Sequence, residues 1–241
     1  MRKIIKGVAG IAGLCCFCGN LSAQTFFEAG ADLVSAYLWR GSKNAGVSIQ
    51  PYASVNFKGL TLEAWSSVSF ERNGLKEIDL NASYEFNSFT IGVSDYWWDE
   101  GDAYSYFRYG KRKTSHSWEA NLLYELPVDK FPLSISWNTV FAGDDYNEAG
   151  KRCYSSYMEL LFPFDLKKVE MEVFAGATPW YSPVVLEDRK GFSVCNIGVG
   201  ARYSIECGKH MSFPFMTQLM FNPATERFHF ALGASVLFKS R

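Results

Sequence analysis

Acidic side chains recur at alternate positions inside apolar segments along much of the chain. Carboxylates gathered in rings around a pore favour cations through their field. The sequence therefore indicates selection of ions or small solutes, provided that these segments surround one interior. The acids in question are Glu28, Asp32, Glu63, Glu77, Asp79, Glu85, Glu119, Glu125, Glu159, Glu170 and Glu172, and the arginines on the same faces are Arg40, Arg202 and Arg227.

Two interpretations of this polar face remain open. In the first, the acids line an open pore and favour cations or cationic solutes. In the second, the arginines pair with carboxylates and hold a filled interior together. The candidate lumen-lining residues are the same in both, namely Asp32, Arg40, Glu63, Asp79, Glu119, Glu159, Glu172, Arg202 and Arg227.

Catalytic chemistry finds little support in the sequence. His229 and Ser235 share a face, but six residues of strand separate them by about 20 Å, whereas a nucleophile and its base need about 3 Å. His116 and its serine neighbours point to opposite faces of a strand. We predict that the chain is not an enzyme. A barrel hydrolase stays as the least favoured alternative, because a serine on a neighbouring strand could still lie beside His229.

The cysteines predict neither a metal site nor a disulfide. No C-x-x-C pair or histidine cluster occurs, and Gly198-Val199-Gly200 is not followed by a helix pattern, so we predict no metal and no dinucleotide cofactor. Cys153 and Cys195 end strands that have another strand between them, about 10 Å apart, beyond the ~7 Å that a disulfide tolerates. With Cys207 at the opposite end, free thiols are expected.

The first 23 residues have the layout of a secretory signal peptide. Arg2, Lys3 and Lys6 precede an apolar stretch from Gly7 to Cys18, and small residues end at Ala23. Residues 24–241 then form the mature domain. Without the three basic residues of the signal peptide, this domain has a formal net charge of −4, so a nucleic-acid partner is not expected.

Alternation with period two predicts an all-β chain of about twelve strands. In residues 77–86 and 227–238, apolar side chains alternate with polar or small ones. Most spans have 10–14 residues, about twice the 5–6 usual in soluble sheets, and this length suits a tilted strand that crosses a bilayer. The predicted spans are 26–41, 46–57, 60–70, 77–86, 89–98, 116–125, 131–141, 153–163, 168–178, 192–205, 212–221 and 227–238.

The links between these spans predict which end faces outward. Brief links follow residues 86, 125, 163 and 205, whereas residues 99–115, 143–152 and 179–191 form longer ones. Outer-membrane barrels place their short turns in the periplasm and their longer loops outside. Tyr37 and Trp39 are then expected in an aromatic girdle at the outer interface. A soluble sandwich would bury its apolar faces and have shorter strands.

Short motifs resemble those of the TorF-type porin family. They are Ser35-Ala36-Tyr37-Leu38-Trp39-Arg40-Gly41, Glu77-Ile78-Asp79-Leu80, His116-Ser117-Trp118-Glu119 and Asn222-Pro223-Ala224-Thr225-Glu226. The resemblance covers most of the mature chain and implies an outer-membrane β-barrel that forms a pore, with no catalytic residues. One departure is that Phe238 is followed by Lys239-Ser240-Arg241, whereas such barrels usually end on an aromatic residue.

Together these features predict a transmembrane antiparallel up-and-down β-barrel in the outer membrane of a Gram-negative bacterium, after a cleaved signal peptide. Outer-membrane lipid would be its partner, and passive passage of small solutes, with a preference for cations, its function. The alternative is a closed barrel whose outer loops 99–115 and 179–191 bind a ligand or partner. Its contacts would be Tyr104, Tyr106, Lys111, Arg112 and Lys113.

Overall fold

A computed structural model describes residues 25–99, 106–109, 114–128, 131–187 and 189–240, so the expected signal peptide at 1–23 lies outside the described residues. Among the described residues no helix is long and apolar enough to cross a membrane. The strands are β1 (Phe26–Val34), β2 (Tyr37–Trp39), β3 (Ser42–Ala45), β4 (Ser48–Phe57), β5 (Leu60–Ser69), β6 (Lys76–Phe86), β7 (Phe89–Trp98), β8 (His116–Glu125), β9 (Ser134–Gly143), β10 (Ser156–Leu166), β11 (Val169–Thr178), β12 (Ser193–Cys207), β13 (Met211–Asn222) and β14 (Arg227–Lys239).

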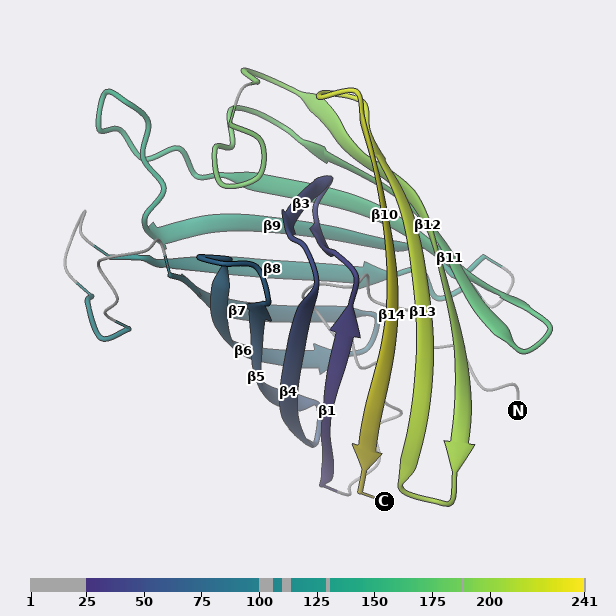
Figure 1. The fold of residues 1–241 in the computed structure, drawn as a ribbon. Helices are drawn as coiled ribbons and strands as arrows, with labels where there is room; N and C mark the ends of the chain where they lie inside the picture. The colour runs from purple at the N-terminus through teal and green to yellow at the C-terminus, as the bar shows by residue number, and fades with distance from the viewer. Residues whose placement is uncertain (1–24, 100–105, 110–113, 129–130, 188, 241) are drawn as a thin grey trace.

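Twelve of these strands form one closed antiparallel barrel, as predicted (Figure 1). Neighbours in the chain are neighbours in the wall, and β1 closes the barrel against β14. The residues after Phe238 extend this seam: the Ser240 amide donates to the Phe27 carbonyl at 2.8 Å, and the Phe27 amide donates to Ser240 Oγ at 2.8 Å. The departure from an aromatic C-terminus therefore adds to the closure of the barrel.

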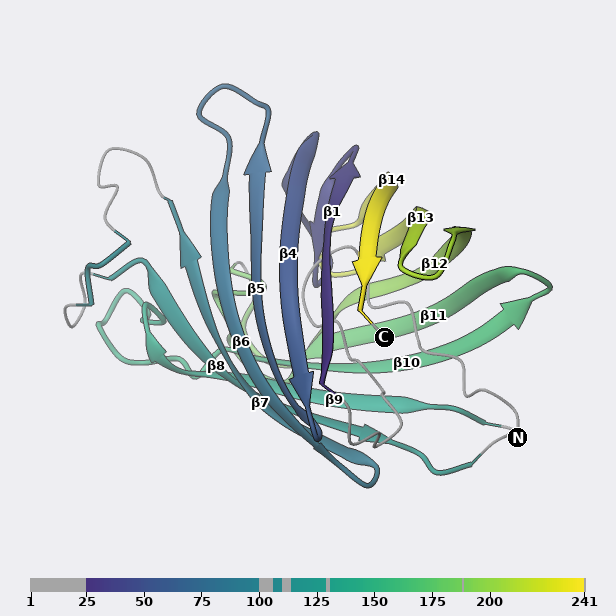
Figure 2. The same ribbon diagram turned by 90° about the horizontal axis from the view of Figure 1, so that it is seen from below.

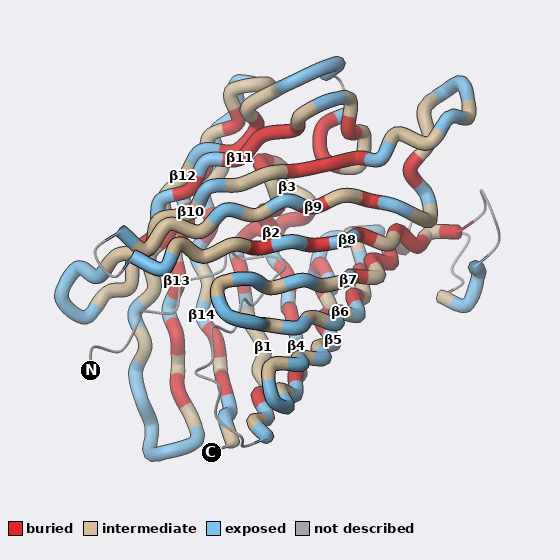
Figure 3. Tube along the Cα trace, turned by 180° about the vertical axis from the view of Figure 1, so that it is seen from behind, coloured by how far each residue is buried: buried red, intermediate tan, exposed pale blue. Residues whose placement is uncertain are grey.

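Buried and exposed residues alternate along several wall strands (Figure 3), and the two faces of the wall have opposite chemistry. On β14, Phe228, Phe230 and Leu232 point outward and are 71%, 56% and 54% exposed, while Ala231 between them is fully buried. Polar side chains such as Gln50, at 1% exposure, are buried inside. A protein in water has the reverse arrangement, because apolar surface is driven out of water. This barrel has instead the apolar exterior and polar interior of membrane-spanning barrels.

The connections differ between the two ends of the barrel. Residues 58–59, 87–88, 167–168 and 208–210 form short turns at one end, and residues 70–75, 144–155 and 179–192 form longer connections at the other. Glu28 pairs with Lys239 near the short-turn end, so both described termini lie there (Figure 2). The predicted difference is confirmed for the turns at 87–88, 167–168 and 208–210 and for the connections at 144–155 and 179–192, whereas the brief link expected after residue 125 spans 126–133, between β8 and β9.

The first strand differs from the prediction. The expected strand 26–41 leaves the wall after Val34, and β2 and β3 form a separate two-stranded hairpin before β4 begins at Ser48. Tyr37, Leu38 and Trp39 are all buried, at 1%, 2% and 9% exposure. A wall strand exposes every second side chain to the outside, whereas these consecutive side chains all need a packed environment. The barrel interior supplies that environment.

Candidate functional site

Residues 36–45, here called the inner hairpin, cross the barrel interior. On one side Leu38 joins a cluster with β11, β13 and β14, and on the other Tyr37 and Trp39 join a cluster with β5, β10 and the 179–192 connection. The first cluster comprises Val34, Ala36, Leu38, Phe174, Met216, Met220 and Ala231, and the second Tyr37, Trp39, Ala45, Trp65, Tyr157, Val185, Leu186 and Cys195. Because these contacts reach different parts of the wall, the hairpin lies inside the barrel. The expectation that Tyr37 and Trp39 lie in an outer girdle is wrong.

Arg40 at the tip of the hairpin forms a two-pronged ion pair with Glu119 on β8. Arg40 Nη1 donates to Glu119 Oε2 at 2.6 Å, and Nη2 donates to Oε1 at 2.7 Å. The Tyr96 hydroxyl also donates to Oε1, at 3.0 Å. Glu119 is only 1% exposed, and such charge-assisted bidentate pairs are among the stronger polar interactions in proteins.

Two aromatic rings accompany the Arg40 guanidinium. Its Cζ atom lies 4.6 Å from the centroid of the Trp39 ring and 4.9 Å from that of Tyr157. The Tyr157 hydroxyl in turn donates to Glu159, and Asn196 Nδ2 donates to the Tyr157 hydroxyl at 2.8 Å. The guanidinium therefore has both a matched carboxylate and two π faces, each of which favours a planar cation.

The backbone at the tip depends on Gly41. Its φ is +93°, and a Cβ atom there would lie 1.9 Å from the Cys195 carbonyl oxygen. Asn222 Nδ2 donates to the Gly41 carbonyl at 2.9 Å, which ties the tip to the end of β13. Arg40 itself has φ +46°, a left-handed conformation that is unfavourable for a residue with a side chain.

A second acidic group lies on the inner face of β6. Glu77 and Asp79 are 2% and 3% exposed, and their carboxyl groups lie close to each other. Tyr37 of the hairpin lies beside Glu77. Glu77 Oε2 and Asp79 Oδ1 have no hydrogen-bond partner among the described residues. Two adjacent carboxyl groups share a proton readily or attract a cation, because both cannot ionise cheaply at close range.

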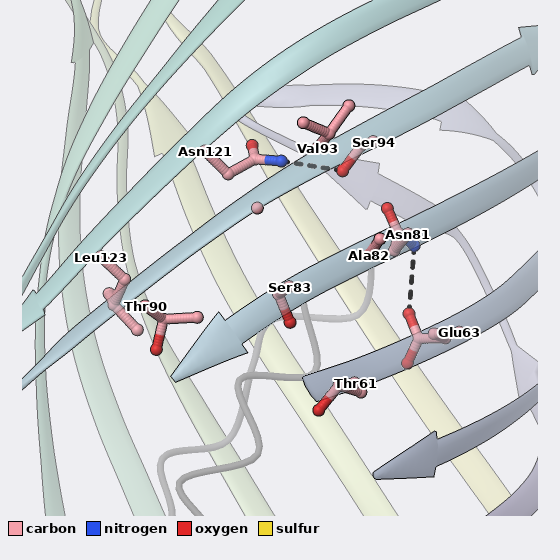
Figure 4. A pocket seen from close by; sticks show the side chains of 11 residues that line it. Thr61, Glu63, Asn81, Ala82, Ser83, Thr90, Val93, Ser94, Asn121 and Leu123 are labelled. Carbon is pink, nitrogen blue, oxygen red and sulfur yellow. Dashed lines mark hydrogen bonds between the residues drawn. The ribbon is translucent and has the colours of Figure 1, made fainter. Parts of the chain in front are cut away.

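A pocket with polar and apolar lining residues lies on the interior wall toward the short-turn end, built from β5 to β8 (Figure 4). Asn81 Nδ2 donates to Glu63 Oε1 at 3.2 Å, and Asn121 Nδ2 donates to Ser94 Oγ at 2.9 Å. The pocket is lined by Thr61, Glu63, Asn81, Ala82, Ser83, Thr90, Gly92, Val93, Ser94, Asn121 and Leu123. Hydroxyl, amide and carboxylate groups on this surface can replace part of the water around a polar solute.

The other predicted lumen residues are dispersed over the wall. Asp32 accepts a hydrogen bond from Ser235 Oγ at 2.5 Å, and Glu172 is 1% exposed on β11. Arg202 donates to Met216 Sδ at 3.3 Å, and Arg227 is exposed at the start of β14. Within the described residues, Arg40 alone of the three predicted arginines forms an ion pair with an acid.

The sequence did not predict a hydrogen-bonded histidine and carboxylate on the outer face of the wall. His116 Nδ1 lies 2.8 Å from Asp95 Oδ1, and its Nε2 lies 2.5 Å from the Tyr106 carbonyl oxygen. The rings of Tyr109 and Trp118 stack on the imidazole, at centroid distances of 4.5 and 5.7 Å. The available signal was that Asp95 and His116 interrupt a face that is otherwise apolar.

The histidines do not form a catalytic pair with serine in the described part of the chain. Both ring nitrogens of His116 are occupied, as above, and no serine or carboxylate hydrogen-bonds His229 there. No group of three or more histidine, cysteine or acidic side chains among those residues is arranged to hold a metal ion. Cys153, Cys195 and Cys207 are free, as predicted.

Comparisons with known proteins found structures of similar fold but no related sequence. No family model matches the chain, and no curated protein matches it. A crystal structure of an outer membrane channel from Pseudomonas putida F1 superposes with a TM-score of 0.50 at 10% identity, covering 95% of this chain and 100% of that chain. Salmonella typhi OmpF in complex with daunomycin gives 0.36 at 6% identity, covering 90% and 97%. The chain is thus similar in fold, a closed antiparallel β-barrel, to that outer membrane channel.

Proposed function

We propose that the chain is a channel of the Gram-negative outer membrane that passes small solutes, prefers cations, and is closed in this conformation by the inner hairpin. The observation that carries the proposal is a polar interior inside an apolar, closed twelve-strand wall. The similarity in fold to an outer membrane channel supports it. Membership of the TorF-type porin family, a non-enzymatic role and a periplasmic location of both termini are parts of the same proposal.

The preference for cations rests on the charge of the interior. Glu77, Asp79 and Glu172 are buried and form no ion pair with a basic side chain among the described residues, while Arg40 is already neutralised by Glu119. Glu172 lies toward the short-turn end, and Glu77 and Asp79 lie toward the long-loop end beside the inner hairpin. A cation therefore has carboxylates near it toward both ends of the interior. Charged groups in a narrow pore act at short range, where water screens them little.

The test is single-channel conductance of refolded protein in a planar bilayer under a tenfold KCl gradient. The native chain is compared with a variant in which residues 37–45 are replaced by a short glycine–serine link. We expect rare, small openings from the native chain and larger, long-lived openings from the variant, both with a reversal potential that favours cations.

A matched control shortens the 147–150 turn of the 144–155 connection, which lies at the same end and contributes no residue to the two hairpin clusters. This control should behave like the native chain. If the hairpin variant folds, inserts and shows no current, the channel proposal fails. The alternative, a closed barrel whose outer connections bind a ligand or partner, would then be favoured. Tyr106 would be one of the residues that contact that ligand or partner.

A further inference from the structure

The groups around the Arg40 side chain form a complete recognition site for a guanidinium ion. Glu119 supplies two acceptor oxygens at 2.6 and 2.7 Å, and the Tyr96 hydroxyl holds that carboxylate in place. Tyr157 supplies a ring face from the wall. All three of these side chains belong to barrel strands, so the site remains when the hairpin moves.

Arg40, by contrast, reaches the site on a segment with few polar ties to the wall. Apart from the bonds of Arg40, Asn222 donates to the Gly41 carbonyl, and Ser35 at the hairpin base bonds Leu232 of β14. The left-handed φ of Arg40 also adds a conformational free-energy cost to the state in which Arg40 is paired with Glu119. The wall half of the site is built from strand residues, whereas its occupant comes from a hairpin outside the wall sheet.

We propose that this site binds solutes that carry a guanidinium group, and that Arg40 occupies it as a built-in competitor. A guanidinium solute that displaces Arg40 from Glu119 would release the inner hairpin and open the lumen. The proposal rests on the proposed channel function for its second step only. The first step is a binding event that needs no conduction.

The geometry favours guanidinium over ammonium. A planar fork matches both carboxylate oxygens at once and lies flat against aromatic faces, whereas an ammonium group is a compact, strongly hydrated point charge. The tethered Arg40 has an effective concentration in the millimolar range by analogy with short linkers, so a free solute must reach about that concentration to compete. Removal of Arg40 should therefore strengthen binding of the free ion.

The experiment measures ethylguanidinium binding by calorimetry to the full-length barrel in detergent, over about 0.1–20 mM, around the effective concentration expected of a short tether. We compare the native chain, Arg40→Ala, and the Arg40→Ala/Glu119→Gln double variant. Saturable binding is expected for Arg40→Ala, at least tenfold weaker binding for the native chain, and none for the double variant. Arg72→Ala removes an exposed arginine from the 70–75 connection and should match the native chain.

Several outcomes would overturn the proposal. Folded Arg40→Ala that binds no ethylguanidinium, or that binds ethylammonium equally well, contradicts guanidinium recognition. If Arg40→Ala does not fold, Arg40→Lys keeps the charge without the fork, and ethylguanidinium should compete with it more effectively than with the native Arg40. Channel recordings separate the two steps: binding without any current overturns the channel proposal alone, whereas current without binding overturns this one.

Discussion

At the level of single residues, the absence of a side chain on Gly176 determines where the Tyr157 ring lies. A Cβ atom on Gly176 would be 2.0 Å from Tyr157 Oη and 2.5 Å from Cζ, so the ring rests against bare backbone on β11. In that position the ring faces Arg40 at 4.9 Å and its hydroxyl reaches Glu159. A glycine inside a strand commonly marks such a close approach. Gly176 therefore belongs to the site although it carries no chemistry.

We predict that Gly176→Ala weakens the closed state. The added methyl group must push the Tyr157 ring away from Arg40, and the lost cation–π contact is worth about 1–2 kcal/mol in a desolvated site. Openings should become about five- to thirtyfold more frequent, because 1.4 kcal/mol corresponds to a factor of ten. The measurement is open probability in a planar bilayer.

A double-mutant cycle checks that this effect passes through the ring. Added to Tyr157→Ala, Gly176→Ala should change the open probability little. Equal effects in both backgrounds would show that the methyl group acts elsewhere, for instance on the pairing of β11 with β12.

A second prediction at this scale concerns Asp79. In the hairpin-shortened barrel, Asp79→Asn should lower the ratio of cation to anion permeability, because it removes a buried carboxylate that has no basic partner within the described chain. The reversal potential under a KCl gradient measures the ratio. Glu148→Gln, an exposed acid in the 144–155 connection, is the control and should leave the ratio unchanged.

At the level of elements, the inner hairpin is the feature that strand periodicity did not predict. Alternation correctly predicted the wall strands because each has one side toward the interior and one outside. It gave 26–41 as one strand, but Tyr37, Leu38 and Trp39 have no polar member between them. The absence of alternation was the available signal. The partner of Arg40 could not be predicted, because Glu119 is 79 residues away and only the inward fold brings them together.

We expect Asn222 to decide how firmly the hairpin is held. Its Nδ2 donates to Gly41, while its Oδ1 accepts from the amides of Ala224 and Thr225, at 3.0 and 3.2 Å. Asn222→Asp keeps the acceptor for those amides but places an oxygen against the Gly41 carbonyl. An unmade buried hydrogen bond costs about 1–3 kcal/mol, so the hairpin should detach more often.

Hydrogen exchange of the residue 36–45 amides measures this detachment, and exchange there should rise about five- to a hundredfold by the same energy. The amides of β13 should stay protected, since the turn after Asn222 keeps its acceptor. Equal loss of protection in β13 and the hairpin would contradict a local tie and indicate general loosening of the wall.

For the whole molecule, the apolar exterior and the difference between the two ends together specify how the barrel sits in a membrane. Cys153 lies in the 144–155 connection at the long-loop end, and Cys207 ends β12 beside a short turn and is exposed. Cys195 is fully buried. The three native thiols therefore report on the outer end, the inner end and the interior of the barrel.

We predict that a membrane-impermeant maleimide added to intact cells labels Cys153 and leaves Cys207 unlabelled. Burial, and next the negative charge of Asp145, raise the pKa of the Cys153 thiol. Because the thiolate is the reactive form, labelling of Cys153 should be faster at pH 9 than at pH 7. After lysis Cys207 should label as well, while Cys195 stays unreactive until the barrel is unfolded. Cys153→Ser and Cys207→Ser identify each labelled site, and labelling of Cys207 in intact cells would mean that the short turns face outward.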